Sequence, residues 1–280
     1  MSSSEAERTV VRYAVADGVC TLTLDDRQRH NAWTPDMERQ YFDLLDRAAT
    51  DEDVRAIVVT GEGRTFCPGL DTGRLEQAAG PVGLRLKGRR SQHYALTIPK
   101  PMIAAINGGC AGIGLVQALV CDVRFAARGA RLSTAYAKLG IPAEYGLSWI
   151  LPRLVGAERA LDLLLSARAI DAEEAERFGL LSRLCEREEV LDAAVAYART
   201  LAATCSPRSM AAIRRQVWGD LSRGYTEANE VWFAAMRQFN DRSNPDFAEG
   251  VASFVEKRPP RFAPLPADFE LPALPPFAAQ

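Results

Sequence analysis

The sequence predicts a mixed α/β fold in which parallel strands alternate with helices. The apolar runs Val54–Thr60 and Met102–Ile106 each end near glycine, as buried strands do. A helix is predicted to begin at Thr34-Pro35, because threonine is a good N-cap and proline fits the first turn. Its apolar residues recur at helical spacing from Met37 to Ala48. Strand–helix–strand order is typical of a parallel sheet covered by helices.

Size and composition limit the classes of protein. The 280 residues, 48% of them hydrophobic, can form one large domain or a core with an appendage. A net charge of −2 argues against a nucleic-acid partner, although 34 Lys and Arg residues allow a local basic patch for a phosphorylated ligand. The six cysteines include no Cys-x-x-Cys pair, so we expect reduced thiols in the core and no metal site. No apolar run reaches the ~18 residues of a membrane span and no signal peptide is apparent, so we expect a cytoplasmic protein.

The segment Lys100–Asp122 combines a strand, a glycine-rich loop and a helix. The strand Met102–Ile106 stops at Asn107-Gly108-Gly109, and a helix of small apolar residues resumes at Leu115–Cys121 after Gly112 and Gly114. The first N–H groups of a helix have no partner within it, which suits an anion or a developing oxyanion. The alternative is that these glycines only permit close packing. A dinucleotide fingerprint is excluded by Gln117 at its third glycine, and the chain has no P-loop Gly-Lys-Ser/Thr tripeptide.

This segment resembles the central signature of the crotonase family, the enoyl-CoA hydratase/isomerase superfamily. The resemblance includes Phe66–Asp71 and Phe254–Arg258, and it extends from about Val10 to Arg261. It implies an α/β, crotonase-like spiral of ββα units with a C-terminal helical oligomerisation region. We therefore expect a spiral core over 1–205, trimerisation helices over 206–258 and a proline-rich tail over 259–280. The resemblance also implies an acyl-CoA substrate and a homotrimer or hexamer.

The resemblance implies a pair of main-chain donors for the thioester oxygen. Phe66–Asp71 is similar to the family's Phe-x-x-Gly-x-Asp turn, in which the N–H after the glycine is one donor. That donor corresponds to Leu70 here, and Gly114 supplies the other. Two fixed N–H groups would stabilise the enolate formed when a proton leaves the carbon next to the thioester. Coenzyme A would be part of the substrate, and no separate cofactor is expected.

Residues for binding coenzyme A follow from the same resemblance. They are Arg29, Leu70, Asp71, Thr72, Gly73, Phe254 and Lys257. Phe254 and Lys257 would contact the coenzyme of a neighbouring subunit. Three alternatives are open: an exposed arginine without a role at Arg29, a helix cap at Asp71, and an ordinary basic helix end at Lys257.

The sequence departs from the hydratase pattern at the two acid/base positions. Hydratases of this family carry two glutamates that position water and move protons. The corresponding positions here are Val116 and Tyr136. The two-glutamate pair is therefore missing from this chain.

A carboxylate occurs further along, at Glu144. Its position resembles the acidic residue of the dienoyl-CoA isomerase branch. It also resembles the nucleophilic Asp of the 4-chlorobenzoyl-CoA dehalogenase branch, where Tyr136 and His93 would complete the site. Desolvation among apolar neighbours should raise the pKa of Glu144 and suit it to proton transfer. The competing interpretation is a surface glutamate that caps the next helix.

The resemblance as a whole implies an enoyl-CoA hydratase/isomerase type of enzyme, a lyase or isomerase of fatty acid metabolism. It would act through a thioester enolate held by Leu70 and Gly114. The residues fit double-bond isomerisation by Glu144 at least as well as hydration. A dehalogenase- or thioesterase-like reaction of Glu144 and a non-catalytic acyl-CoA-binding protein are the alternatives.

Overall fold

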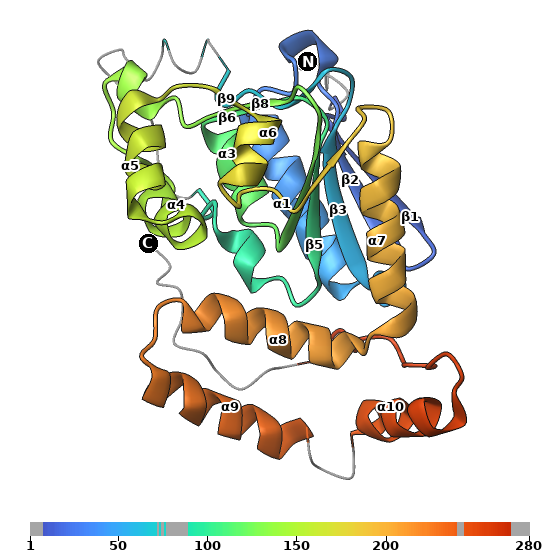
Figure 1. The fold of residues 1–280 in the computed structure, drawn as a ribbon. Helices are drawn as coiled ribbons and strands as arrows, with labels where there is room; N and C mark the ends of the chain where they lie inside the picture. The colour runs from blue at the N-terminus through green and yellow to red at the C-terminus, as the bar shows by residue number, and fades with distance from the viewer. Residues whose placement is uncertain (1–7, 72, 74–75, 77–88, 240–243, 270–280) are drawn as a thin grey trace, which may run out of the picture.

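The computed structural model describes residues 8–71, 73, 76, 89–239 and 244–269, which form two sheets and surrounding helices (Figure 1). Thr72, residues 77–88 and residues 270–280 of the tail lie outside these ranges. The larger sheet has the strand order β1 (Val11–Ala16), β2 (Val19–Leu24), β3 (Ala56–Gly61), β5 (Met102–Ile106), β7 (Val123–Ala127) and β10 (Arg183–Cys185). The smaller sheet has the order β4 (Thr65–Cys67), β6 (Gly109–Ala111), β8 (Arg131–Ser133) and β9 (Ile170–Asp171).

Three successive strand pairs alternate between these sheets. β3, β5 and β7 are parallel neighbours in the larger sheet, and β4, β6 and β8 are parallel neighbours in the smaller one. The chain crosses from one sheet to the other between the members of each pair, with Gly61 and Gly108 at two of the crossings. A Cβ on Gly61 would lie 2.7 Å from Phe66 Cα, and one on Gly108 would lie 2.9 Å from the Arg64 carbonyl carbon. Each repeat thus places one strand in each sheet, and helix α3 follows β6. This arrangement is the predicted crotonase-like spiral of ββα units.

The helices lie around and below the sheets. They are α1 (Pro35–Thr50), α3 (Ile113–Leu119), α4 (Leu147–Val155), α5 (Ala157–Ser166), α6 (Ala172–Arg177), α7 (Val190–Thr204), α8 (Pro207–Asp220), α9 (Tyr225–Phe239) and α10 (Pro245–Glu256). The predicted start of α1 is confirmed, because the Thr34 hydroxyl accepts a hydrogen bond of 3.1 Å from Met37 N. Single-turn 3₁₀ helices lie at Arg27–Arg29, Tyr94–Thr97 and Tyr136–Leu139.

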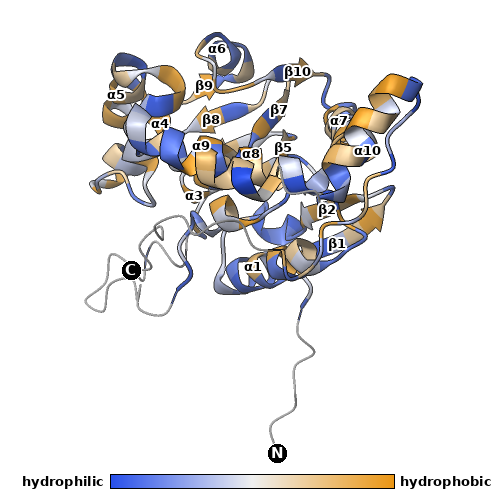
Figure 2. Cartoon of the chain, turned by 90° about the horizontal axis from the view of Figure 1, so that it is seen from below, coloured by the Kyte–Doolittle hydropathy of each residue, from blue (hydrophilic) through white to orange (hydrophobic). Residues whose placement is uncertain are grey.

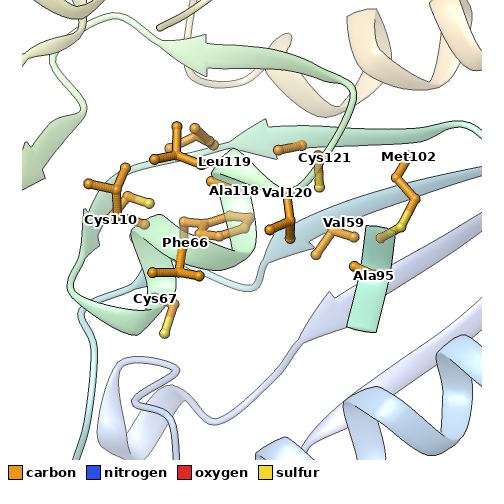
Figure 3. Close-up of a cluster of buried hydrophobic side chains, with 14 of the residues drawn as sticks. Val59, Phe66, Cys67, Ala95, Met102, Cys110, Ala118, Leu119, Val120 and Cys121 are labelled. Atoms are coloured by element: carbon orange, nitrogen blue, oxygen red, sulfur yellow. The ribbon is translucent and has the colours of Figure 1, made fainter. Parts of the chain in front are cut away.

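Each face of the larger sheet has its own apolar core. α7 covers one face (Figure 1), where Ala56 and Val58 pack with Ala194 and Ala198. Ile57 and Val59 point to the other face and pack with α1 and α3. This alternation follows from the two-residue period of a strand. Figure 3 shows how the second core extends to the smaller sheet, with Phe66, Cys67 and Cys110 beside the helix that carries Ala118 and Val120.

The last three helices lie together below the sheets in Figure 1. A buried polar cluster joins α8 to the core: Asp122 accepts hydrogen bonds from Arg214 Nε at 2.8 Å, from Trp218 Nε1 at 2.7 Å and from Met102 N at 2.7 Å. The same guanidinium donates to the carbonyl oxygens of Leu96, Ile98 and Ala95. The first tail residues also contact the core, because Arg55 donates to Phe262 O at 2.7 Å.

Replacing Arg214 by Met should destabilise the protein strongly. The substitution keeps the apolar stem but leaves the Asp122 carboxylate and three carbonyl oxygens without this donor. Removing one partner of such a buried pair typically costs about 3–5 kcal/mol. Urea denaturation measures the loss, with Arg128→Met as the control, because the ion-pair partners of Arg128 among the described residues are the exposed carboxylates of Glu173 and Glu186. A loss for Arg214→Met no larger than for the control would contradict this role.

Candidate functional site

The loop after β4 and the beginning of α3 are in direct backbone contact. β4 and β6 pair in parallel, with Thr65 opposite Gly109 and Cys67 opposite Cys110. A Cβ added to Gly114 would overlap the carbonyl oxygen of Cys67 and lie 2.7 Å from Cys67 Cβ. A Cβ added to Gly69, which has φ +106°, would lie 3.2 Å from Ala111 O. The two glycine-containing segments that the sequence singles out therefore meet in space.

Unpaired N–H groups lie on both of these segments. Within the described residues, the N–H groups of Leu70, Ile113 and Gly114 donate no hydrogen bond. Gly112 is the N-cap of α3, so Ile113 and Gly114 occupy its first turn, where N–H groups have no partner inside the helix. The family resemblance selected Leu70 and, of the two helix amides, Gly114 alone. The structure adds Ile113, which the second glycine pair could have indicated.

Trp33 fixes the orientation of the Leu70 amide. The backbone N–H of Trp33 donates a 2.7 Å hydrogen bond to Gly69 O. Trp33 and Leu70 also form an isolated parallel β-bridge. The oxygen of Gly69 and the N–H of Leu70 belong to one planar trans peptide and point in opposite directions. Because Trp33 binds the oxygen, the Leu70 N–H faces away from Trp33. The sequence contained no signal for this role.

Glu144 lies half-buried on the loop between the Tyr136–Leu139 turn and α4, and its carboxylate has no hydrogen bond or ion pair within the described residues. Burial raises the pKa of Glu144, and the nearby positive charge of Arg89 opposes part of this rise. Its side chain does not cap α4, whose N-cap is Gly146 without a side-chain cap. The structure thus disfavours the capping alternative.

Tyr136 and His93 lie next to the same loop. Burial, with a smaller effect of the Glu144 charge, raises the pKa of Tyr136, whose buried hydroxyl has no hydrogen-bond partner in the described part of the chain. The His93 ring packs on Gly146, where an added Cβ would lie 2.8 Å from His93 Nε2. Burial lowers the pKa of His93, which favours the neutral imidazole. His93 directly precedes the 3₁₀ turn Tyr94–Thr97 as its N-cap residue. Val116 is fully buried in the core.

The residues expected to bind coenzyme A fall into two groups. Arg29 is half-exposed near the Leu70 loop, with Asp26 at 3.4 Å and Asp71 at 3.8 Å. Asp71 accepts a 3.2 Å hydrogen bond from the backbone N–H of Gly73, two residues further along. Phe254 is 85% exposed and Lys257 ends α10. Figures 1 and 2 both place α10 away from α3, so these two residues are not brought to the loop–helix site within one chain.

The described ranges contain neither a helix that could span a membrane nor a cluster of metal-ligating side chains. None of their helices is long and apolar enough to cross a membrane. Among the same residues, no three His, Cys, Asp or Glu side chains gather as metal ligands would. The six cysteines are unpaired, and five of them are buried.

Together, the two-sheet spiral and the contact between the Leu70 loop and the start of α3 define an α/β protein with unpaired main-chain N–H groups, within the described residues, on two adjacent segments. The enoyl-CoA hydratase/isomerase family model matches residues 14–264, and the chain belongs to this family. It is 32% identical to a 1,2-epoxyphenylacetyl-CoA isomerase from Escherichia coli K12 over 89% of this chain and 96% of that protein. It is 35% identical to a probable enoyl-CoA hydratase from Rhodobacter capsulatus over 90% and 97%.

Solved structures agree with this assignment. A probable enoyl-CoA hydratase/isomerase from Mycobacterium abscessus superposes with a TM-score of 0.82 at 31% identity, covering 91% of this chain and 99% of that one. An enoyl-CoA hydratase, EchA12_1, from Mycobacterium marinum has 45% identity and a TM-score of 0.67, covering 77% and 100%.

Proposed function

We propose that this protein isomerises a double bond in an acyl-CoA thioester through an enolate intermediate. One observation carries the proposal: the Leu70 amide and the first-turn amides of α3 donate no hydrogen bond to any described residue, and they lie on two segments whose backbones touch. Donors preorganised in this way stabilise negative charge as it develops on a thioester oxygen. Leu70 and a first-turn amide, Gly114 or Ile113, would form this pair.

Glu144 would carry the proton. As a carboxylate it takes a proton from the carbon between the thioester and a 3,4 double bond, and the electron pair moves to the thioester oxygen. The resulting dienolate regains a proton at the far carbon, which leaves the double bond conjugated with the thioester. One carboxylate suffices for this sequence, whereas hydration in the family uses two. Val116 and Tyr136 at the two hydratase positions thus favour isomerisation over hydration.

The assay compares two substrates. The protein is incubated with crotonyl-CoA and with a 3-enoyl-CoA, and the absorbance of the conjugated thioester is followed. A rise with the 3-enoyl substrate supports isomerisation, and a fall with crotonyl-CoA shows hydration instead. Measurable acyl-CoA binding with no change in either reaction would contradict an enzymatic role and favour the acyl-CoA-binding alternative.

Coenzyme A would enter as part of the substrate, with no separate cofactor. The positive charge of Arg29 at the edge of the Leu70 loop suits a phosphate of the nucleotide, and Asp71, Gly73 and Thr72 follow on the same segment. Phe254 and Lys257 would reach the coenzyme of a neighbouring subunit. A cytoplasmic location and a place in fatty acid metabolism remain part of the proposal.

A homotrimer, alone or paired into a hexamer, is the proposed assembly. An open groove of about 710 Å³ lies among α8, α9 and α10, with Trp232, Phe247 and Phe254 on its lining. Figure 2, seen from below, shows hydrophobic stretches along α9 and α10, and the exposed side chains include Ile213, Val217, Phe233, Val251 and Val255. Exposed apolar patches of this kind mark protein interfaces.

Light scattering should therefore give three or six times the chain mass of 30.6 kDa. Phe247→Asp should shift the protein towards the monomer, because it places a charge in the groove. Leu165→Asp on α5 is the matched control at another exposed apolar residue. A monomeric parent protein would contradict the proposed assembly.

A further inference from the structure

A buried polar network connects the parts of the candidate site. Its centre is Glu38 on α1, which is 8% exposed. The Glu38 carboxylate accepts hydrogen bonds from Trp33 Nε1 at 2.9 Å, from Arg89 Nε at 2.8 Å and from Gln92 Nε2 at 3.3 Å. A buried carboxylate is costly unless it is paired and hydrogen-bonded, and here it is both.

Each donor leads to a different part of the site. Trp33 binds Gly69 O through its backbone and thereby orients the Leu70 amide. The Gln92 side chain accepts a 2.8 Å hydrogen bond from Gln117 Nε2 on α3, the helix whose first turn carries the second donor. Arg89 Nη1 lies 3.4 Å from the Tyr145 hydroxyl, and its guanidinium carbon lies 5.9 Å from the centre of the Tyr145 ring. Tyr145 directly follows Glu144.

We propose that Glu38 is a positioning residue that couples the oxyanion donors to the Glu144 loop, and that the Glu38–Arg89 pair sets the charge that Glu144 experiences. The effect on rate rests on the proposed function. The electrostatic effect on Glu144 does not, because it can be measured without turnover.

The charges around Glu144 determine whether each substitution should raise or lower the pKa of Glu144. Among the described residues, the positive charge of Arg89 acts on Glu144, the charge of Glu144 acts on Tyr136, and the His93 ring packs on Gly146, two residues further along. Arg89 is the cation among them, and Glu38 balances its charge. In a variant with neutral residue 38, no carboxylate at this position offsets the positive charge of Arg89. Glu144 then experiences more of that charge, which should lower the pKa of Glu144. Removing the guanidinium should raise that pKa.

The test uses Glu38→Gln and Arg89→Met. The pKa of Glu144 is measured by ¹³C NMR of labelled glutamate carboxyls, with the Glu144 signal identified by its loss in Glu144→Gln. We expect shifts of about half a pH unit, downward for Glu38→Gln and upward for Arg89→Met. Arg89→Lys keeps the charge and should restore most of the parent value. The matched control is Arg90→Met, because the neighbouring Arg90 pairs with Asp46 and stacks on Tyr94.

A merely structural network would change the melting temperature without shifts of opposite sign. Shifts of the same sign, or none, would overturn the proposal. Should Arg89→Met fail to fold, Glu38→Gln/Arg89→Met removes both charges together, and the Glu144 pKa should then lie above that of Glu38→Gln alone. For turnover, Glu38→Gln should lower kcat about ten- to hundredfold with KM little changed, because small displacements of reacting groups are costly. Opposite pKa shifts in a protein that turns over no acyl-CoA would contradict the proposed function and leave the electrostatic coupling supported.

Discussion

Glu144→Gln should lower kcat for isomerisation of a 3-enoyl-CoA about 10²–10⁴-fold, the range expected for loss of a positioned general base. The rate falls because Gln cannot accept the proton. Because Gln has the size of Glu, the affinity for acyl-CoA should stay within about twofold. In the parent protein, the acid limb of the rate profile should lie above the ordinary pKa range of glutamate, because burial raises the pKa of Glu144. Stopped-flow absorbance and calorimetry measure the two effects separately.

The stability of the same variant supplies an internal control. A carboxyl whose pKa is raised in the folded state favours folding when protonated, and this contribution is lost as pH rises through the folded pKa. At neutral pH the buried charge therefore opposes folding, and Glu144→Gln should melt at the same temperature as the parent or higher. At pH 4 the advantage should disappear. An unchanged kcat in a folded variant would show that Glu144 does not carry the proton.

Gly114→Ala should lower kcat/KM about 10²–10³-fold, which is the typical cost of losing one oxyanion donor. The added methyl would overlap Cys67 O and lie 2.7 Å from Cys67 Cβ, so the helix start and the Leu70 loop would have to separate. The displacement should move both donors relative to the thioester oxygen. Steady-state kinetics give the loss, and circular dichroism confirms that the variant is folded.

Gly224→Ala is the matched control for this substitution. A Cβ on Gly224 meets no atom within 4 Å among the described residues, and its φ is not in the left-handed region. It should leave kcat/KM within about twofold, since surface substitutions of this kind have small effects. Equal losses of kcat/KM in the two variants would show that the loss does not arise from the close contact at Gly114.

The longer elements were predictable from the sequence because their apolar residues recur at the spacing of a helix or form a continuous buried strand. The predicted strand Met102–Ile106 has the bounds of β5, and the helix predicted at Thr34-Pro35 begins at Pro35 as α1. The short strands β6, β9 and β10 were missed, since two or three residues carry no measurable period. The arrangement of the two sheets came from the family resemblance, because it depends on contacts between distant segments.

The site was predictable where glycine is required by a close approach. Gly69, Gly108 and Gly114 each lie where a side chain would meet backbone atoms of another segment. Trp33, Glu38 and Arg89 escaped prediction, because a hydrogen-bonded network between α1 and residues 89–92 has no local signature. Glu38 in particular has the position of an ordinary first-turn glutamate, whose negative charge suits a helix start.

A crystal structure of the protein with a bound, unreactive acyl-CoA analogue tests the central claim most directly. We predict that the thioester oxygen lies about 2.7–3.1 Å from the Leu70 nitrogen and from the nitrogen of Gly114 or Ile113, with the Glu144 carboxylate next to the adjacent carbon. A thioester oxygen bound elsewhere, with both amides turned away from it, would contradict the account.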